Sequence, residues 1–179
     1  MRQRIAWISI PITAAALALS SSCEREVAKS EATLDQTAAA GVRVTGGGRI
    51  DPTLVDKTTF GFTVDGTSGP PFKGQLQVVF HLMLLKAHST LIDQFELDQT
   101  CARFRGTVRT SDGHTDHRFR AVACDNGEPG SSPGTGPDKF GICIDDHRST
   151  DPLAWNPLTQ KCDRDPEPTE LTGGNIQLH

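Results

Sequence analysis

Five arginines stand at alternating positions in two short segments, on either side of the dipeptide Asp112-Gly113. Because successive side chains of a strand point to opposite faces, this spacing places the arginines on one face of a β-hairpin. A guanidinium group can form two parallel hydrogen bonds with a carboxylate or a phosphate, so this face is a candidate site for anionic groups. The alternative is a solvated face that pairs with acids such as Asp116, Asp145 and Asp146, the more usual role of an arginine stripe. The arginines are Arg103, Arg105, Arg109, Arg118 and Arg120, of which Arg103, Arg105, Arg118 and Arg120 are the candidate binding residues.

Three acidic residues, Asp125, Glu128 and Asp138, lie in or beside the turn-forming segment NGEPGSSPGTGP. Oxygen ligands from a glycine-rich loop suit Ca²⁺, so these three residues are candidate calcium ligands. Turn capping by aspartate side chains is the alternative, and it is favoured because the spacing matches no EF-hand loop.

The hairpin tip gathers His114 and His117 with Asp112 and Asp116, residue types that also bind transition metals. Polar residues are expected at any turn tip, so a solvated turn is the preferred interpretation. The sequence contains no G-x-S-x-G elbow, H-E-x-x-H pair or phosphate loop. We therefore expect no enzyme activity, and no cofactor apart from the calcium considered above.

Four cysteines follow Cys23, and in an exported protein an even set indicates structural disulfides. Residues that oppose each other about Asp112-Gly113 have numbers adding to 225, which aligns Cys101 with Cys124. Four cysteines allow three pairings, and Cys124–Cys143 stays open because those side chains also point outward. The register favours Cys101–Cys124 together with Cys143–Cys162.

Alternation of apolar and polar residues indicates strands through most of the chain. The expected strands are 41–50, 57–65, 75–82, 85–97, 101–109, 117–124, 139–146 and a last one within LTGGNIQLH. A helix over 82–92 is the competing interpretation of one ambiguous apolar run. Leu82 is assigned to the core face of its strand, and Leu91, Phe95 and Leu97 to one face of the next.

The fold class expected from this pattern is all-β: a single antiparallel sheet of about eight strands, closed into a barrel or folded as a sandwich. The closing segment TGGNI is similar to VTGGGRI near the start, so we expect the first and last strands to pair. The domain covers residues 41–179, and 147–170 is expected to be a loop insertion.

The first 40 residues are interpreted as export and anchoring segments. Residues 1–22 have a basic start, a short apolar core and small residues before Cys23, which is typical of a signal peptide. Cys23 is the odd cysteine of five and is the expected lipidation site, as in a bacterial lipoprotein. Residues 23–40 then form a lipid-anchored tether. The expected location is the periplasm or the cell surface, with secretion if Cys23 is not modified.

The charge balance disfavours nucleic acid as a partner. The formal net charge is −4, and removing Arg2 and Arg4 with the signal peptide makes it −6. An acidic chain is poorly suited to nucleic acid or anionic lipid surfaces, so membrane contact is expected through the lipid anchor alone.

A series of segments in order carries a family resemblance: GGGRI, TTFGFTV, KGQLQVVFH, KAHSTLIDQFEL, CARFRGTVR, ACDNGEPG, PDKFGI and LTGGNIQLH. From Gly41 onward the chain resembles the post-COAP-1 domain, a β-domain of exported bacterial proteins often found beside cell-surface anchoring modules. The resemblance implies an extracellular β-domain and brings no established activity. The four cysteines and the insertion 147–170, with Trp155, depart from the pattern.

Two functions are compatible with these features. The first is a structural or interaction module at the cell envelope that binds an unidentified macromolecule through its loops or its arginine face. The second is a carrier of a small apolar ligand inside a β-barrel. The interior distinguishes them, because six phenylalanines should fill a solid core in the first case: Phe60, Phe62, Phe80, Phe104, Phe119 and Phe140.

Overall fold

The segments of alternating polarity form antiparallel strands. The computed structural model describes residues 41–52, 56–127 and 136–179. Within these residues eight strands are six residues or longer, as many as the sequence predicts. Their bounds are Arg43–Ile50 (β1), Thr58–Asp65 (β2), Lys73–Phe80 (β3), Leu85–Asp98 (β4), Cys101–Thr110 (β5), His117–Cys124 (β6), Lys139–Ile144 (β7) and Gly173–Leu178 (β12).

The insertion 147–170 contains four strands of two residues each. They are Arg148–Ser149 (β8), Trp155–Asn156 (β9), Lys161–Cys162 (β10) and Thr169–Glu170 (β11). Strands β8 and β11 both pair with β7, while β9 and β10 pair only with each other among the described strands. The insertion is therefore tied to β7 at both of its ends.

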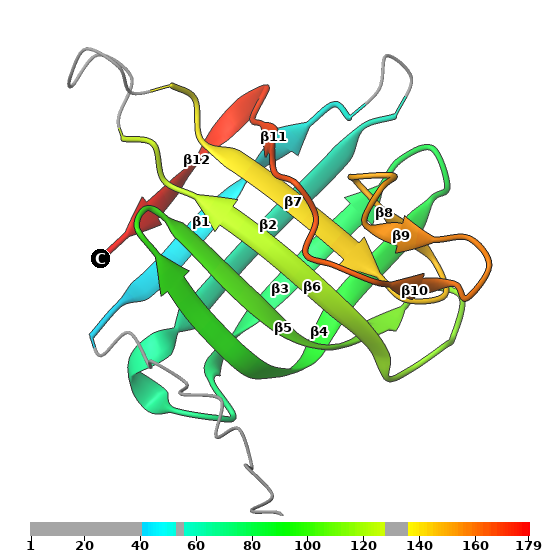
Figure 1. Cartoon of the computed structure of the whole chain (residues 1–179), viewed down its shortest axis with the longest axis horizontal. Helices are drawn as coiled ribbons and strands as arrows, with labels where there is room; N and C mark the ends of the chain where they lie inside the picture. Colours follow the sequence, from blue (N-terminus) through cyan, green and yellow to red (C-terminus); the bar gives the residue numbers. More distant parts are fainter. Residues whose placement is uncertain (1–40, 53–55, 128–135) are drawn as a thin grey trace, which may run out of the picture. The chain divides into compact units, whose positions relative to one another are not determined.

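The sheet curls into a half-barrel. In the part of the chain that the structure describes, its order is β11-β7-β6-β5-β4-β3-β2-β1-β12, and every pairing is antiparallel. The first and last strands pair, with Val44 opposite Leu178, as predicted. Strands β11 and β12 end the order on opposite sides, yet only Leu171 and Thr172 separate them in sequence. In Figure 1 strands β6 and β7 run across β1, β2 and β3, so the sheet folds over on itself.

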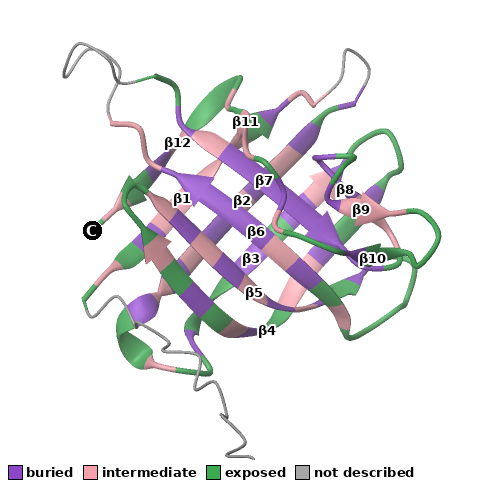
Figure 2. Cartoon of the chain, in the orientation of Figure 1, coloured by how far each residue is buried: buried purple, intermediate pink, exposed green. Residues whose placement is uncertain are grey.

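Phenylalanine rings fill the space between the two crossing halves of the sheet. All six phenylalanines predicted for the core belong to one buried cluster and are at most 7% exposed. The rings of Phe60 on β2 and Phe140 on β7 stack with centroids 3.8 Å apart, although these strands lie on different halves. Figure 2 shows the buried residues along the crossing strands. Burying this much aromatic surface is the main contribution to the stability of the fold.

The hairpin of β5 and β6 has the predicted register, with Cys101 opposite Cys124 and Gly106 opposite Phe119. Disulfides join Cys101 to Cys124 and Cys143 to Cys162, the pairing that the register favours. Cys143 points outward from the sheet, but it is fully buried because the insertion packs over it.

Two details of the predicted strands are wrong. Strand β3 ends at Phe80, and Leu82 lies in the following turn with 55% of its surface exposed. In β4 the pairing register shifts between Ser89 and Leu91 and again between Ile92 and Gln94. These bulges turn Leu91 outward and place Ile92 in the core, whereas simple alternation predicts the reverse. The helix considered for 82–92 is absent, since a turn and the start of β4 occupy that range.

Residues 1–40 lie outside the described part of the chain, and with them the predicted signal peptide, Cys23 and the tether. In the remainder no helix has the length and apolar character needed to cross a membrane.

Candidate anion-binding face

The arginines of β5 and β6 lie on the outer face of the hairpin, because the alternate positions point into the core. Arg105 is directly opposite Arg120 in the ladder, and Arg118 is two residues from Arg120 on the same face. Like charges directly opposite each other on a sheet destabilise it. This face therefore needs compensating anions from other parts of the chain.

Asp165 of the insertion supplies a carboxylate that three of the arginines share. Arg105 holds it in a two-point contact, donating from Nε to Oδ1 at 3.1 Å and from Nη2 to Oδ2 at 2.9 Å. Arg103 Nε lies 3.9 Å from Oδ2, and Arg120 Nη1 lies 3.8 Å from Oδ1. The contact with Arg105 is the planar geometry in which guanidinium groups bind carboxylates most strongly.

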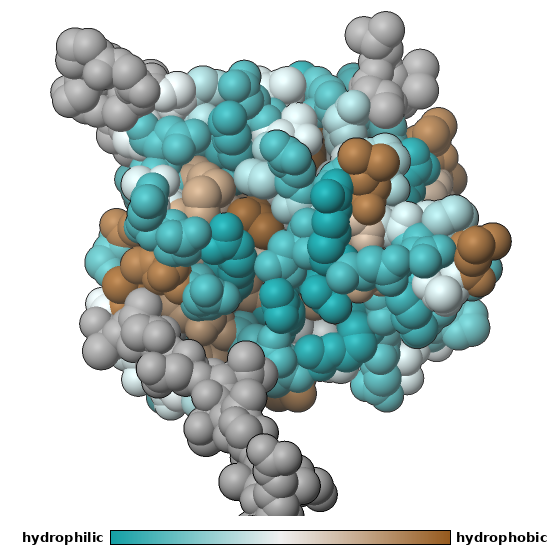
Figure 3. Space-filling view, in the orientation of Figure 1, coloured by the Kyte–Doolittle hydropathy of each residue, from teal (hydrophilic) through white to brown (hydrophobic). Residues whose placement is uncertain are grey.

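The segment 163–168, here called the strap, carries Asp165 across the arginine face. One end is fixed by the disulfide between Cys162 and Cys143 of β7. Further along, the Glu167 N–H donates to Asp151 Oδ2 at 3.0 Å, and Asp151 is buried. Figure 3 shows mainly hydrophilic surface where the insertion crosses β6 and β7. The strap thus holds an acidic side chain against a basic face that lies some 60 residues earlier in sequence.

Arg118 and Arg103 have further partners at the margins of the face. Both Nη atoms of Arg118 donate to the carboxylate of Asp93, which lies on β4, and this hydrogen bonding raises the pKa of the guanidinium. Arg103 Nη1 donates to Asp98 Oδ2 at 3.0 Å. The acids that pair directly with the arginines are therefore Asp93, Asp98 and Asp165. Of the three expected acids, Asp145 attracts Arg118 electrostatically, while Asp146 lies against His117.

A pocket of about 170 Å³ opens between the arginines and the insertion. Its lining comprises Gln94, Arg105, Arg118, Arg120, Asp145 and Cys162. The Arg120 side chain is about one-third exposed, and its guanidinium makes a long ion pair of 3.8 Å with Asp165. A guanidinium group has five N–H donors, so those of Arg120 are available to a ligand.

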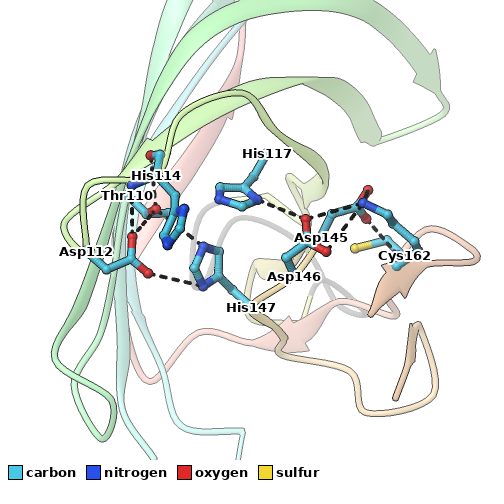
Figure 4. A network of polar contacts seen from close by, with 9 residues as sticks. Thr110, Asp112, His114, His117, Asp145, Asp146, His147 and Cys162 are labelled. Carbon is cyan, nitrogen blue, oxygen red and sulfur yellow. Dashed lines mark hydrogen bonds and ion pairs between the residues drawn. The ribbon is translucent and has the colours of Figure 1, made fainter. Parts of the chain in front are cut away.

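A second polar cluster connects the hairpin tip to the turn after β7 (Figure 4). His117 Nδ1 lies 3.1 Å from Asp146 Oδ2, and the rings of His117 and His147 have centroids 4.5 Å apart. His147 Nε2 lies 3.3 Å from Thr110 Oγ1, and its Nδ1 lies 3.7 Å from Asp112 Oδ2. Burial, followed by the neighbouring His117, lowers the pKa of His147. The cluster thus keeps His147 neutral over a wider pH range.

This cluster does not provide a metal centre. Among the described residues no group of three or more His, Cys, Asp or Glu side chains could hold a metal ion. The histidines interact through ring packing and through contacts with carboxylates and Thr110, and the side chains of His117 and His147 are largely buried rather than solvated. His147 was not expected here, because it belongs to an insertion whose path no sequence periodicity indicates.

The aspartates proposed as calcium ligands connect β12 to the loop between β6 and β7. Each accepts one backbone N–H from that loop and one from β12. The donors are Gly127 at 2.9 Å and Leu178 at 2.9 Å for Asp125, and Asn126 at 2.9 Å and Ile176 at 2.6 Å for Asp138. Glu128 lies outside the described residues. Calcium binding stays a prediction, while backbone capping is the role seen for the two aspartates.

Comparisons of the chain with known protein families, with curated proteins and with solved structures find no match. The arginine face is therefore interpreted from its own chemistry. Arg103, Arg105 and Arg120 share the carboxylate of Asp165. Arg105, Arg118 and Arg120 border a polar pocket.

Proposed function

We propose that this chain is an exported interaction module of the bacterial cell envelope, anchored by a lipid on Cys23, that binds its partner through the arginine face. The observation that carries the proposal is the grouping of four arginines on one face of a disulfide-linked hairpin, three of them around the shared carboxylate of Asp165. Two disulfides are consistent with folding in an oxidising compartment. The resemblance to the post-COAP-1 domain, which remains a prediction, agrees with such a location.

The state of the interior favours an interaction module over a carrier of apolar ligands. A carrier needs apolar space inside the sheet, whereas the six core phenylalanines are buried, and the rings of Phe60 and Phe62 pack against those of Phe140 and Phe104 across it. Partners would then bind at the surface, where charged groups set orientation and specificity.

The binding part of the proposal is tested by capture from envelope extract with the full chain. The test variant is Arg120→Glu, and the control is Arg109→Glu, which changes an exposed arginine of the same hairpin outside the pocket. After crosslinking, we expect the wild-type chain and Arg109→Glu to capture the same partner. Arg120→Glu should not capture it. A partner retained by both variants, or lost by both, contradicts the proposed surface.

The anchoring part is tested separately with Cys23→Ala. We expect the wild-type chain to fractionate with membranes and to incorporate labelled fatty acid, while the variant does neither. Membrane association that persists in Cys23→Ala without the label contradicts lipid anchoring and leaves the binding surface unaffected.

A further inference from the structure

We propose that the pocket bordered by Arg105, Arg118 and Arg120 binds a phosphate group. The inference rests on the proposed function, because it names the chemistry of the group that the arginine face recognises. Three observations support it: the donors of Arg120, the binding geometry that Asp165 displays, and the polar lining of the pocket.

Arg120 has more hydrogen-bonding capacity than the protein uses. It lies directly opposite Arg105 in the ladder, and it makes only a long contact with Asp165 among the described residues. The second anion of the face, Asp93, is engaged by Arg118. A ligand carrying negative charge would reduce the repulsion between Arg105 and Arg120 and accept the free N–H groups.

Asp165 shows which ligand geometry this face accepts. Its two oxygens each receive one N–H from Arg105, while Arg103 and Arg120 lie near one oxygen each. A phosphate group can accept the same two-point contact from a guanidinium group, and it adds further acceptors with more charge. It can therefore contact Arg118 and Arg120 from within the pocket, whereas the planar carboxylate of Asp165 reaches the arginines from the strap.

The size and lining of the pocket suit a compact oxyanion. A volume of about 170 Å³ is on the order of ten times that required by one water molecule, enough for a phosphate that keeps part of its hydration. Apart from Cys162 the lining is polar or charged.

Asp145 is the one carboxylate in the lining, and its oxygens are already engaged. Oδ1 accepts the Cys162 N–H at 2.8 Å, and Oδ2 lies 3.5 Å from Lys161 Nζ. Arg105 and Arg118 are paired with Asp165 and Asp93, so Arg120 is the arginine of the lining without a close carboxylate. Its positive charge suits phosphate better than a neutral or apolar ligand.

The test is calorimetric titration of the full chain with inorganic phosphate at neutral pH and low ionic strength. We expect Arg120→Ala to weaken phosphate binding by about tenfold or more, as the loss of a charge-assisted contact implies. The control Arg109→Ala should bind as the wild type does. Arg120→Ala should also melt within a few degrees of the wild type, because losing the long ion pair with Asp165 is offset by losing the repulsion between Arg105 and Arg120. We expect Asp165→Asn to bind phosphate several-fold more tightly, since it removes a competing negative charge.

Three results would overturn the inference: no phosphate binding by the wild-type chain at millimolar concentration, equal affinity in Arg120→Ala, or acetate binding as tightly as phosphate. Vesicles with and without phosphatidic acid identify the source of the group. Binding to the acidic vesicles indicates a lipid headgroup, and binding to free phosphate alone indicates a soluble or polymer-borne phosphate.

Failure of this inference is distinguishable from failure of the proposed function. Acetate binding as tightly as phosphate, together with Arg120-dependent capture of an envelope partner, would leave the arginine face intact and make its ligand a carboxylate. Arg120-dependent phosphate binding with no Arg120-dependent capture would support the pocket and contradict the interaction module.

Discussion

Replacing Asp138 with Asn should destabilise the domain strongly, although it removes only one charge and no volume. Asp138 is buried, and its two oxygens accept the N–H groups of Asn126 and Ile176 at 2.9 and 2.6 Å. Its backbone oxygen accepts the N–H of Leu171 as well. Asp138 directly precedes β7, so its bond to Ile176 joins β12 to the start of β7. These two strands are not paired with each other in the sheet.

An asparagine keeps one acceptor and presents an NH₂ group to the second N–H. The cost is one hydrogen bond to a charged group, worth about 1.5–3 kcal/mol, together with a buried donor left unsatisfied, about 1–3 kcal/mol. A central value of about 4 kcal/mol corresponds to a fall in Tm of roughly 14 °C for a domain of about 140 residues.

The assay is thermal unfolding followed by circular dichroism, with Asp116→Asn as the matched control. Asp116 is exposed and adopts positive φ, which asparagine tolerates, so the control should keep the wild-type Tm. Each protein is also melted with a chelator and with added Ca²⁺. A loss below about 1 kcal/mol in Asp138→Asn would refute the capping role. A similar loss in the wild type on chelation would show that Asp138 acts as a calcium ligand.

Three further predictions concern the hairpin, the strap and the histidine cluster. Gly106→Ala should cost more than about 2 kcal/mol, because its Cβ would clash with the Leu91 carbonyl oxygen, whereas Gly61→Ala, with open space around it, should be neutral or slightly stabilising in urea unfolding. Removing the Cys143–Cys162 disulfide by a double serine substitution should cost about 3 kcal/mol and alter phosphate affinity by freeing the strap, while removing Cys101–Cys124 should leave that affinity unchanged. The pKa of His147 is lower in the folded chain than in the unfolded chain. As the pH falls, His147 is therefore protonated first in the unfolded chain, so the free energy of unfolding should decrease as the pH drops through about 6.5. His147→Gln should flatten that fall, and an unchanged pH dependence would exclude His147 as its cause.

The hairpin could be predicted because its determinants are local. Alternating side chains fix the faces of β5 and β6, and Asp112-Gly113 fixes the turn, so the register followed from residue numbers alone. The same periodicity identified the core phenylalanines. It failed in β4, because bulges insert residues without any marked change in composition and thereby reverse the faces of Leu91 and Ile92.

The anionic partners of the arginines could not be predicted. Asp165 reaches them from an insertion that has almost no periodic pattern, and its path depends on the Cys143–Cys162 disulfide and on the buried Asp151. Of the acids that sequence proximity suggested, Asp145 attracts Arg118 but its carboxylate accepts the Cys162 N–H, and Asp146 pairs with His117. Arginines on a strand are visible in a sequence, whereas the groups that partner them are determined by tertiary structure.

The most direct test of the arginine face as a ligand site is to follow the Nε–H resonances of the arginines by NMR during a phosphate titration of the full chain. The proposal predicts that the signals of Arg105, Arg118 and Arg120 shift together and saturate at one affinity, while those of Arg49 and Arg109 stay in place. Small shifts of all five signals that follow ionic strength without saturating would show that the arginines form a solvated, salt-bridged face.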